Sequence, residues 1–133
     1  SSYAFFQMYD GIFRIENDQL PWCHLQLISP EYGATLSGGR VSFEWELHPL
    51  AARYHMRIDR YRISYTNLAA SDIDINWFEG DFEVQSDGRL TGPSLPTFTW
   101  GTYYWYVYAY TADGGLIAES GGYITPGSRF TVP

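Results

Sequence analysis

Four oxygen-bearing side chains near the middle of the chain have the spacing of a calcium-binding loop, at positions 1, 3, 5 and 12. They are Asp72, Asp74, Asn76 and Glu83. The sixth position, where such a loop needs a turn-making glycine, is Trp77. Ile73 and Ile75 alternate with the acids as in a β-strand, which directs the apolar side chains inward and the acids to solvent. The pattern therefore predicts a solvated acidic strand, with weak calcium binding as the alternative.

The three histidines do not form a recognisable metal or catalytic motif. They are His24, His48 and His55, and no two of them have the helical i, i+4 spacing of a zinc protease. Cys23 is the only cysteine, so no disulfide forms within the chain. The sequence lacks the nucleophile-elbow, phosphate-loop and dinucleotide-binding motifs, and no acid–base pair stands out. We expect no catalytic activity and no cofactor.

Residues 101–110, GTYYWYVYAY, carry aromatic side chains at both parities of a strand. One face would present Tyr103, Trp105, Val107 and Ala109, and the opposite face Tyr104, Tyr106, Tyr108 and Tyr110. If Trp105 and Val107 face the core, a ladder of tyrosines remains outside and needs a cover. Tyrosine suits both protein interfaces and stacking on sugar rings. The cover is therefore a partner subunit, a glycan, or other parts of the same chain.

Residues 1–22 form an extension that is too apolar for a solvated linker. Its large apolar side chains are Tyr3, Phe5, Phe6, Met8, Tyr9, Ile12, Phe13 and Ile15. These residues either pack on their own domain or add as a strand to the sheet edge of a neighbouring subunit. Strand donation of this kind would link subunits head to tail into a filament.

Three tryptophans are candidates for stacking on a carbohydrate, namely Trp22, Trp77 and Trp100. Together with the tyrosine ladder, they raise the alternative of a carbohydrate-binding accessory module.

Composition indicates one all-β domain. The 133 residues are 19% aromatic, and aromatic side chains favour strands. A net charge of −7, with arginine as the only strong cation because lysine is absent, disfavours binding to nucleic acid. No apolar run is long enough to span a membrane.

Alternating apolar residues separated by turn signals predict the strands. In residues 41–47, Val41, Phe43, Trp45 and Leu47 share the inward face. The parity changes between Ile58 and Tyr61, which predicts a bulge at Asp59. Residues 72–84 and a turn at Asp87-Gly88 indicate a hairpin, residues 89–99 supply at most a short or edge strand, and residues 102–110 and 128–132 supply the last strands. Such spacing is typical of a two-sheet antiparallel Greek-key sandwich over residues 23–133.

From about Leu27 onward the chain resembles the fibronectin type III-like, immunoglobulin-like repeats of bacterial surface proteins. The resemblance rests on ISPEYGATLSGGRVSFEWEL at 28–47, RYRISYTN at 60–67, and GTYYWYVYAY at 101–110 with SRFTV at 128–132. It implies a Greek-key β-sandwich at the cell surface or outside the cell. Residues 1–22 have no counterpart in the repeat. We expect a non-catalytic structural module, such as a filament or surface-layer subunit that self-assembles, with carbohydrate binding as the alternative.

Overall fold

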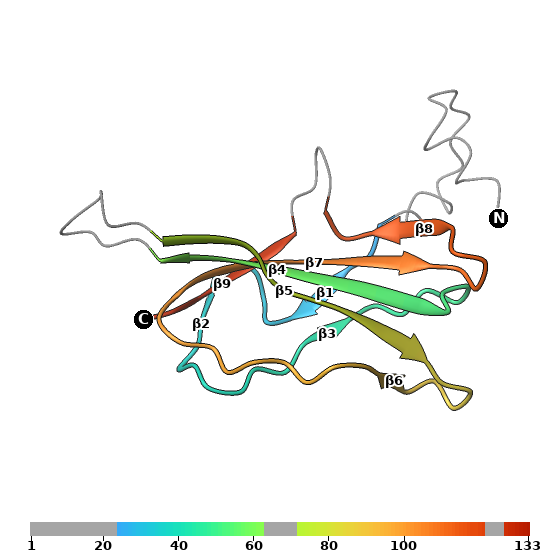
Figure 1. Ribbon diagram of the computed structural model, residues 1–133, viewed down its shortest axis with the longest axis horizontal. Coiled ribbons are helices and arrows are strands. Elements are labelled where there is room, and N and C mark those ends of the chain that lie inside the picture. The colour runs from blue at the N-terminus through green and yellow to red at the C-terminus, as the bar shows by residue number, and fades with distance from the viewer. Residues whose placement is uncertain (1–23, 63–71, 122–126) are drawn as a thin grey trace, which may run out of the picture.

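The computed structural model describes residues 24–62, 72–121 and 127–133, and these ranges contain strands and no helix. The strands are β1 (Leu27–Ser29), β2 (Ala34–Thr35), β3 (Glu44–Trp45), β4 (Arg53–Arg62), β5 (Asp72–Val84), β6 (Leu90–Thr91), β7 (Gly101–Tyr110), β8 (Leu116–Glu119) and β9 (Ser128–Val132). They form a 2-stranded sheet of β1 and β3 and a 7-stranded sheet (Figure 1). Within the described ranges, no helix could span a membrane. The predicted all-β class and the division into two sheets are confirmed.

Strand β7 lies at the centre of the larger sheet, whose order is β2-β9-β7-β4-β5-β6 with β8 also paired to β7. One edge of β7 is antiparallel to β4 along its length, from Tyr110 opposite Arg53 to Thr102 opposite Tyr61. Its other edge pairs with β9 near the start and with β8 near the end. This arrangement satisfies the backbone of β7 on both sides and fixes the direction of its side chains.

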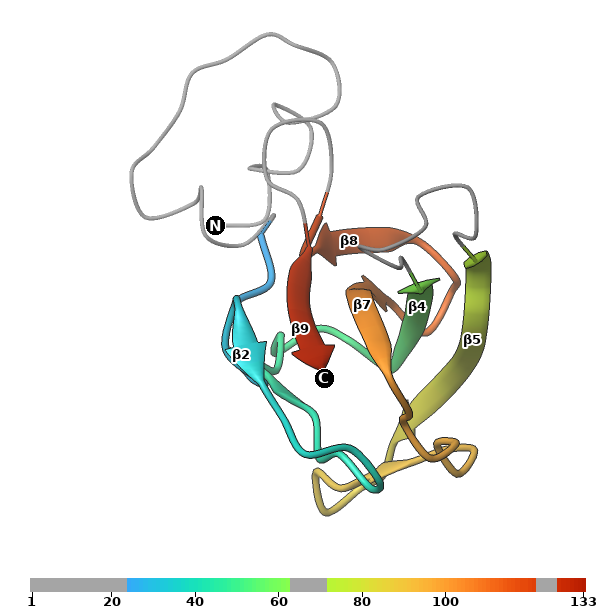
Figure 2. The same cartoon turned by 90° about the vertical axis from the view of Figure 1, so that its left-hand side faces the viewer.

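The larger sheet curls, so that the segments beyond its edge strands approach each other (Figure 2). Gly39, which follows β2, and Phe98, which follows β6, exchange two backbone hydrogen bonds of 2.9 and 2.8 Å. The curl encloses an aromatic core. Trp45 of the small sheet lies against Tyr54, Phe82 and Trp105, which project from β4, β5 and β7.

The alternation predicted for the last strands is confirmed. Tyr103, Trp105, Val107 and Ala109 are completely buried, and Phe130 and Val132 of β9 are buried as well. The turn at Asp87-Gly88 is also present, because Gly88 N–H donates to the carbonyl of Gln85 at 2.9 Å. The segment after it contributes only the two residues of β6.

The inward direction predicted for Leu47 is wrong, because its side chain is 53% exposed. Strand β3 ends at Trp45, and beyond Glu46 the chain turns through residues 48–51 instead of continuing in the sheet. The backbone N–H of His48 donates to the Tyr54 hydroxyl at 2.7 Å, which fixes this turn. Val41, Phe43 and Trp45 do pack on the core as predicted.

The irregularity expected at Asp59 lies in the neighbouring strand. Strand β4 stays in continuous register with β7, while Ile58 pairs with Phe78 and Arg60 with Asp74. Three residues of β5, 75–77, therefore lie opposite Asp59 alone. Asn76 adopts a positive φ of 58°, and its N–H donates to Asp59 Oδ1 at 2.8 Å.

The faces of β5 differ from those that the sequence pattern predicts. Ile73 and Ile75 are 54% and 59% exposed, so their predicted inward direction is wrong. Tyr61, expected to share the core parity, instead lies opposite Ile73 and packs on Tyr104, on the outer side of the sheet. Both corrections follow from the register. Ile73 shares the parity of Glu79, Asp81 and Glu83, because the bulge adds two residues and so keeps the parity of β5. Tyr61 shares the parity of Arg53, because β4 alternates without interruption.

Candidate interaction face

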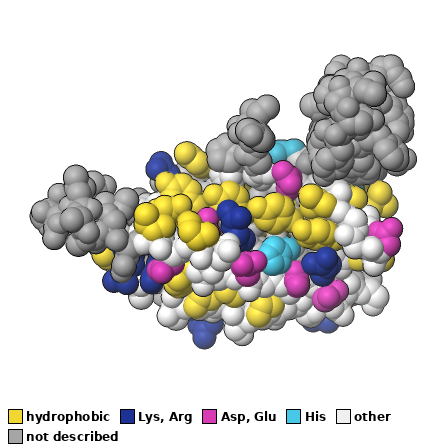
Figure 3. All heavy atoms as spheres, turned by 45° about the horizontal axis from the view of Figure 1, so that its top comes forward, with side chains coloured by type: hydrophobic (Ala, Val, Ile, Leu, Met, Phe, Trp, Pro, Cys, Tyr) yellow, Lys and Arg dark blue, Asp and Glu magenta, His cyan; other side chains and the backbone are white. Residues whose placement is uncertain are grey.

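The side of the large sheet that faces away from the core, called the outer face here, carries the tyrosine ladder. Tyr104, Tyr106, Tyr108 and Tyr110 are partly exposed, whereas the residues between them are buried. In Figure 3, apolar side chains form a band across the molecule, bordered by arginine, histidine and acidic side chains. The outward direction predicted for these tyrosines is confirmed.

Two arginines of β4 lie over tyrosine rings of β7. Arg53 is opposite Tyr110 and Arg57 is opposite Tyr106 in the strand register. Their guanidinium carbons lie 4.3 and 4.4 Å from the two ring centres. Each such contact contributes about 0.5–1 kcal/mol at an exposed site. One side of each of these rings is therefore already occupied by a cation.

His55 is held between two carboxylates at the middle of the outer face. Its Nδ1 lies 2.9 Å from Asp81 Oδ1 and its Nε2 lies 2.9 Å from Glu79 Oε2. Only a protonated imidazole donates from both nitrogens, so this geometry fits the cationic form of His55. The hydrogen bond from His55, together with Arg53 at 2.9 Å, lowers the pKa of Asp81.

Strands β4 and β5 thus place matched charges side by side. The register sets Arg53 opposite Glu83, His55 opposite Asp81 and Arg57 opposite Glu79. We call these three pairs the charge rows. Next to them, burial raises the pKa of Tyr106 and of Tyr108, so both hydroxyls remain protonated at neutral pH.

Beyond the bulge the outer face becomes apolar. Tyr61 packs edge-on against Tyr104 with ring centres 5.0 Å apart, and Ile73 lies beside Tyr61 in the register. Ile73 and Ile75 each expose more than half of their surface. The sequence pattern missed these three residues as members of the face, because it assigned them to the core side of their strands.

The four candidate calcium ligands do not come together. Asp74 binds the guanidinium of Arg60, with Oδ2 2.9 Å from Nε. Glu83 lies opposite Arg53 in the strand register. Arg53 is seven positions from Arg60 along β4, so Glu83 and Asp74 lie at sites about 23 Å apart, at roughly 3.3 Å per residue. The structure describes no side chain for Asp72, and the described part of the chain contains no group of three or more acids, histidines or cysteines that could hold a metal ion.

The tryptophan candidates are separated. Trp77 packs into the core, with its ring centre 5.2 Å from those of Phe98 and Tyr103. Trp100 is 43% exposed, with the guanidinium of Arg62 5.3 Å from its ring centre. Trp22 lies outside the described residues, as do all the apolar side chains named in residues 3–15. Of the described candidates, Trp100 is thus the more accessible.

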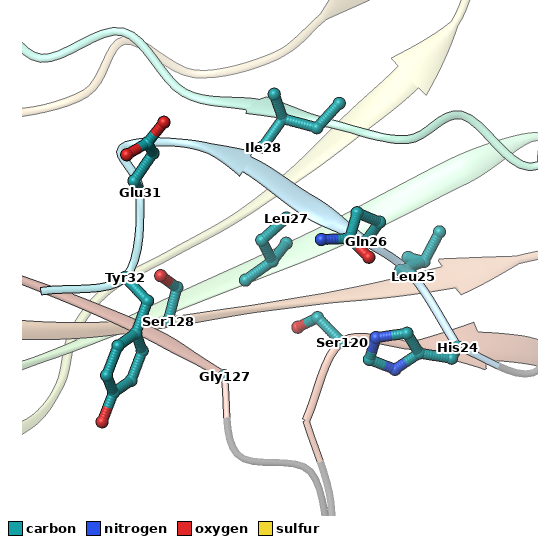
Figure 4. Close-up of a pocket in the computed structure, with 10 residues that line it drawn as sticks. All are labelled: His24, Leu25, Gln26, Leu27, Ile28, Glu31, Tyr32, Ser120, Gly127 and Ser128. Carbon is teal, nitrogen blue, oxygen red and sulfur yellow. The ribbon is translucent and has the colours of Figure 1, made fainter.

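A second feature is a surface hollow of about 460 Å³ beside β1, next to the end of β8 and the start of β9 (Figure 4). Its polar lining residues are His24, Gln26, Glu31, Tyr32, Ser120 and Ser128. Ser120 Oγ accepts the N–H of Val107 at 2.8 Å, just beyond the end of β8. The hydroxyl therefore has a structural role.

Comparisons with protein-family models, curated proteins and solved structures yield no match to this chain.

Proposed function

We propose that this protein is a non-catalytic structural module, a subunit of an extracellular filament or surface layer that assembles with copies of itself. The outer face would be one contact surface. The N-terminal segment, residues 1–22, would be the second, added as a strand to a neighbouring subunit. Placement outside the cell follows from the resemblance to bacterial surface repeats.

The observation that carries the proposal is the exposure of Ile73 and Ile75, at 54% and 59%, next to the aromatic pair Tyr61–Tyr104. A sheet that faces water on one side normally presents polar side chains there. Here large apolar side chains occupy both sides of the sheet. Exposed apolar patches of this kind mark protein contact sites.

The balance of apolar and charged groups also supports a protein partner. The interior of a protein interface is enriched in tyrosine and arginine and depleted in lysine, and this chain contains twelve tyrosines and no lysine. The charge rows lie beside the tyrosines, where they would supply polar contacts around an aromatic centre.

We further propose that the fold is a Greek-key sandwich of the fibronectin type III-like kind. Two observations support this architecture. The indoles of Trp45 and Trp105 meet at 6.5 Å across the core, one from each sheet. The larger sheet also has β7 between β4 and β9, so that the last strand returns beside the central one.

Carbohydrate binding is the second candidate, and the exposure of Trp100 favours it. A sugar ring stacks on an open aromatic face, however, and arginines already occupy one side of the rings of Tyr106, Tyr110 and Trp100. The assembly role therefore accounts for more of the outer face. Glycan-array binding that is lost in Tyr106→Ala or Trp100→Ala would favour the carbohydrate role instead.

Deletion of residues 1–20 tests the strand-donation part of the proposal. We expect the full chain to show a concentration-dependent mass in multi-angle light scattering, and the shortened chain to remain small. An identical mass distribution for the two proteins would remove the N-terminal segment from the assembly mechanism.

A further inference from the structure

The centre of the outer face is built around an imidazole. Histidine is the side-chain type whose charge ordinarily changes between about pH 5 and 8. His55 is the only histidine of the charge rows, because its five companions are arginines and carboxylates. Its side chain is 25% exposed, so water reaches the ring. A change in His55 therefore changes the charge in the middle of the proposed contact surface.

The two carboxylates that hold His55 are not equally supported. Asp81 also pairs with Arg53 at 2.9 Å, whereas Glu79 has His55 as its only ion-pair partner among the described residues. A neutral imidazole has one N–H and presents a lone pair to the other carboxylate. Loss of the His55 proton therefore removes one of its two hydrogen bonds and the positive charge that Glu79 and Asp81 share.

The remaining groups around His55 make the released charge unfavourable. On β4 its neighbours are Arg53 and Arg57, and Arg57 is already engaged with Asp59 at 3.3 Å. On β7 it faces Tyr108, whose ring centre is 6.3 Å away, and Tyr108 lies opposite Glu119 of β8. The excess negative charge left at Glu79 and Asp81 would thus lie near Glu119, on a chain of net charge −7.

We propose that the protonation of His55 controls self-association through the outer face, with assembly favoured when His55 carries its proton. This inference rests on the proposed function, because it specifies how the same surface is regulated. Protonation keeps each charge row neutral, so the face can be covered without burying an unpaired carboxylate. When the proton is lost, each contact must either desolvate one carboxylate whose charge is no longer balanced or place it near another negative charge.

The test is the assembly of the full chain at about pH 5.5 and about pH 8, followed by light scattering over a concentration series. For the unmodified protein we expect the critical concentration to rise about two- to fivefold at the higher pH, the range that one partly exposed ion pair supplies. His55→Gln should remove this dependence and assemble weakly at both values. His55→Arg should assemble well at both, because its charge is permanent.

His24→Gln is the matched control, because His24 is exposed and lies outside the charge rows. It should keep the pH dependence of the unmodified protein. Thermal unfolding confirms that each variant is folded, and if His55→Gln does not fold, His55→Arg alone decides the matter.

The outcomes separate the two proposals. If the unmodified protein assembles and His55→Gln or His55→Arg retains its full pH dependence, control by His55 is wrong and the assembly role stands. If the unmodified protein stays monomeric at both pH values, the assembly role fails, and the control by His55 fails with it.

Discussion

Asp59 accepts a hydrogen bond of 2.8 Å from the backbone N–H of Asn76, and this contact joins β4 to the bulge of β5. Asp59 is only 4% exposed and also pairs with Arg57. The carboxylate of Asp59 therefore holds the bulge of β5, which includes Ile75.

Replacing this carboxylate should destabilise the fold. Asp59→Ala leaves the Asn76 N–H and the Arg57 guanidinium without their acceptor, which costs about 1–3 kcal/mol of unfolding free energy. Asp59→Asn keeps an acceptor oxygen and should lose less. Urea denaturation of the two variants measures the difference. Equal stability of Asp59→Ala and the unmodified protein would show that the bulge does not depend on this side chain.

Removing a tyrosine hydroxyl should destabilise the fold much more on the inner face of β7 than on its outer face. The Tyr103 hydroxyl donates to the Thr99 carbonyl at 2.7 Å and accepts the Thr99 N–H at 3.1 Å. Tyr103→Phe should therefore cost about 1–3 kcal/mol of unfolding free energy, while Tyr104→Phe, which keeps the ring contact with Tyr61, should cost much less. A comparison of their thermal midpoints checks this, and equal losses would contradict the assignment of faces.

The apolar end of the outer face should matter for assembly and not for folding. Ile73→Lys and Ile75→Lys introduce charge at side chains that are 54% and 59% exposed, so the thermal midpoint should change little. The critical concentration for assembly should rise about tenfold or more, because a buried lysine without a partner is strongly disfavoured at an interface. Leu50→Lys, at a side chain 49% exposed in the 48–51 turn, is the control. Normal assembly of the isoleucine variants would exclude this part of the face.

Acid should weaken the interaction between β4 and β5 through Asp81. Hydrogen bonding to His55 and Arg53 lowers the pKa of Asp81 below its ordinary value of 3.8. The folded state then binds fewer protons than the unfolded state, so this stabilisation is complete above that value and is lost as the pH falls through the folded pKa. Asp81→Asn should flatten the dependence of the thermal midpoint on pH below about pH 4. An unchanged slope would show that Asp81 contributes nothing to it.

Local patterning predicts β7 and β9 well for a physical reason. Strand β7 pairs with other strands along both edges, so its side chains point strictly to alternate sides of the sheet. Those on the inner side, such as Trp105 and Val107, are buried. The same pattern separates the outer tyrosines from the core. These features depend on neighbouring residues in the sequence and on a period of two.

The features that local patterning misses depend on distant residues. The outward direction of Ile73 depends on its pairing with Tyr61 of β4. The exposure of Leu47 depends on Tyr54, whose hydroxyl accepts the His48 N–H and fixes a turn. The stacking of Arg57 on Tyr106 requires the register between β4 and β7. None of these relationships is present in the alternation of a single segment.

Electron microscopy of the purified full chain shows whether the protein self-assembles, because a polymer of repeating subunits is visible without any labelled ligand. We expect filaments or sheets at about pH 5.5 that become scarce in Ile73→Lys and Ile75→Lys. Dispersed single particles of the unmodified protein at every concentration and pH would contradict the assembly role of the outer face.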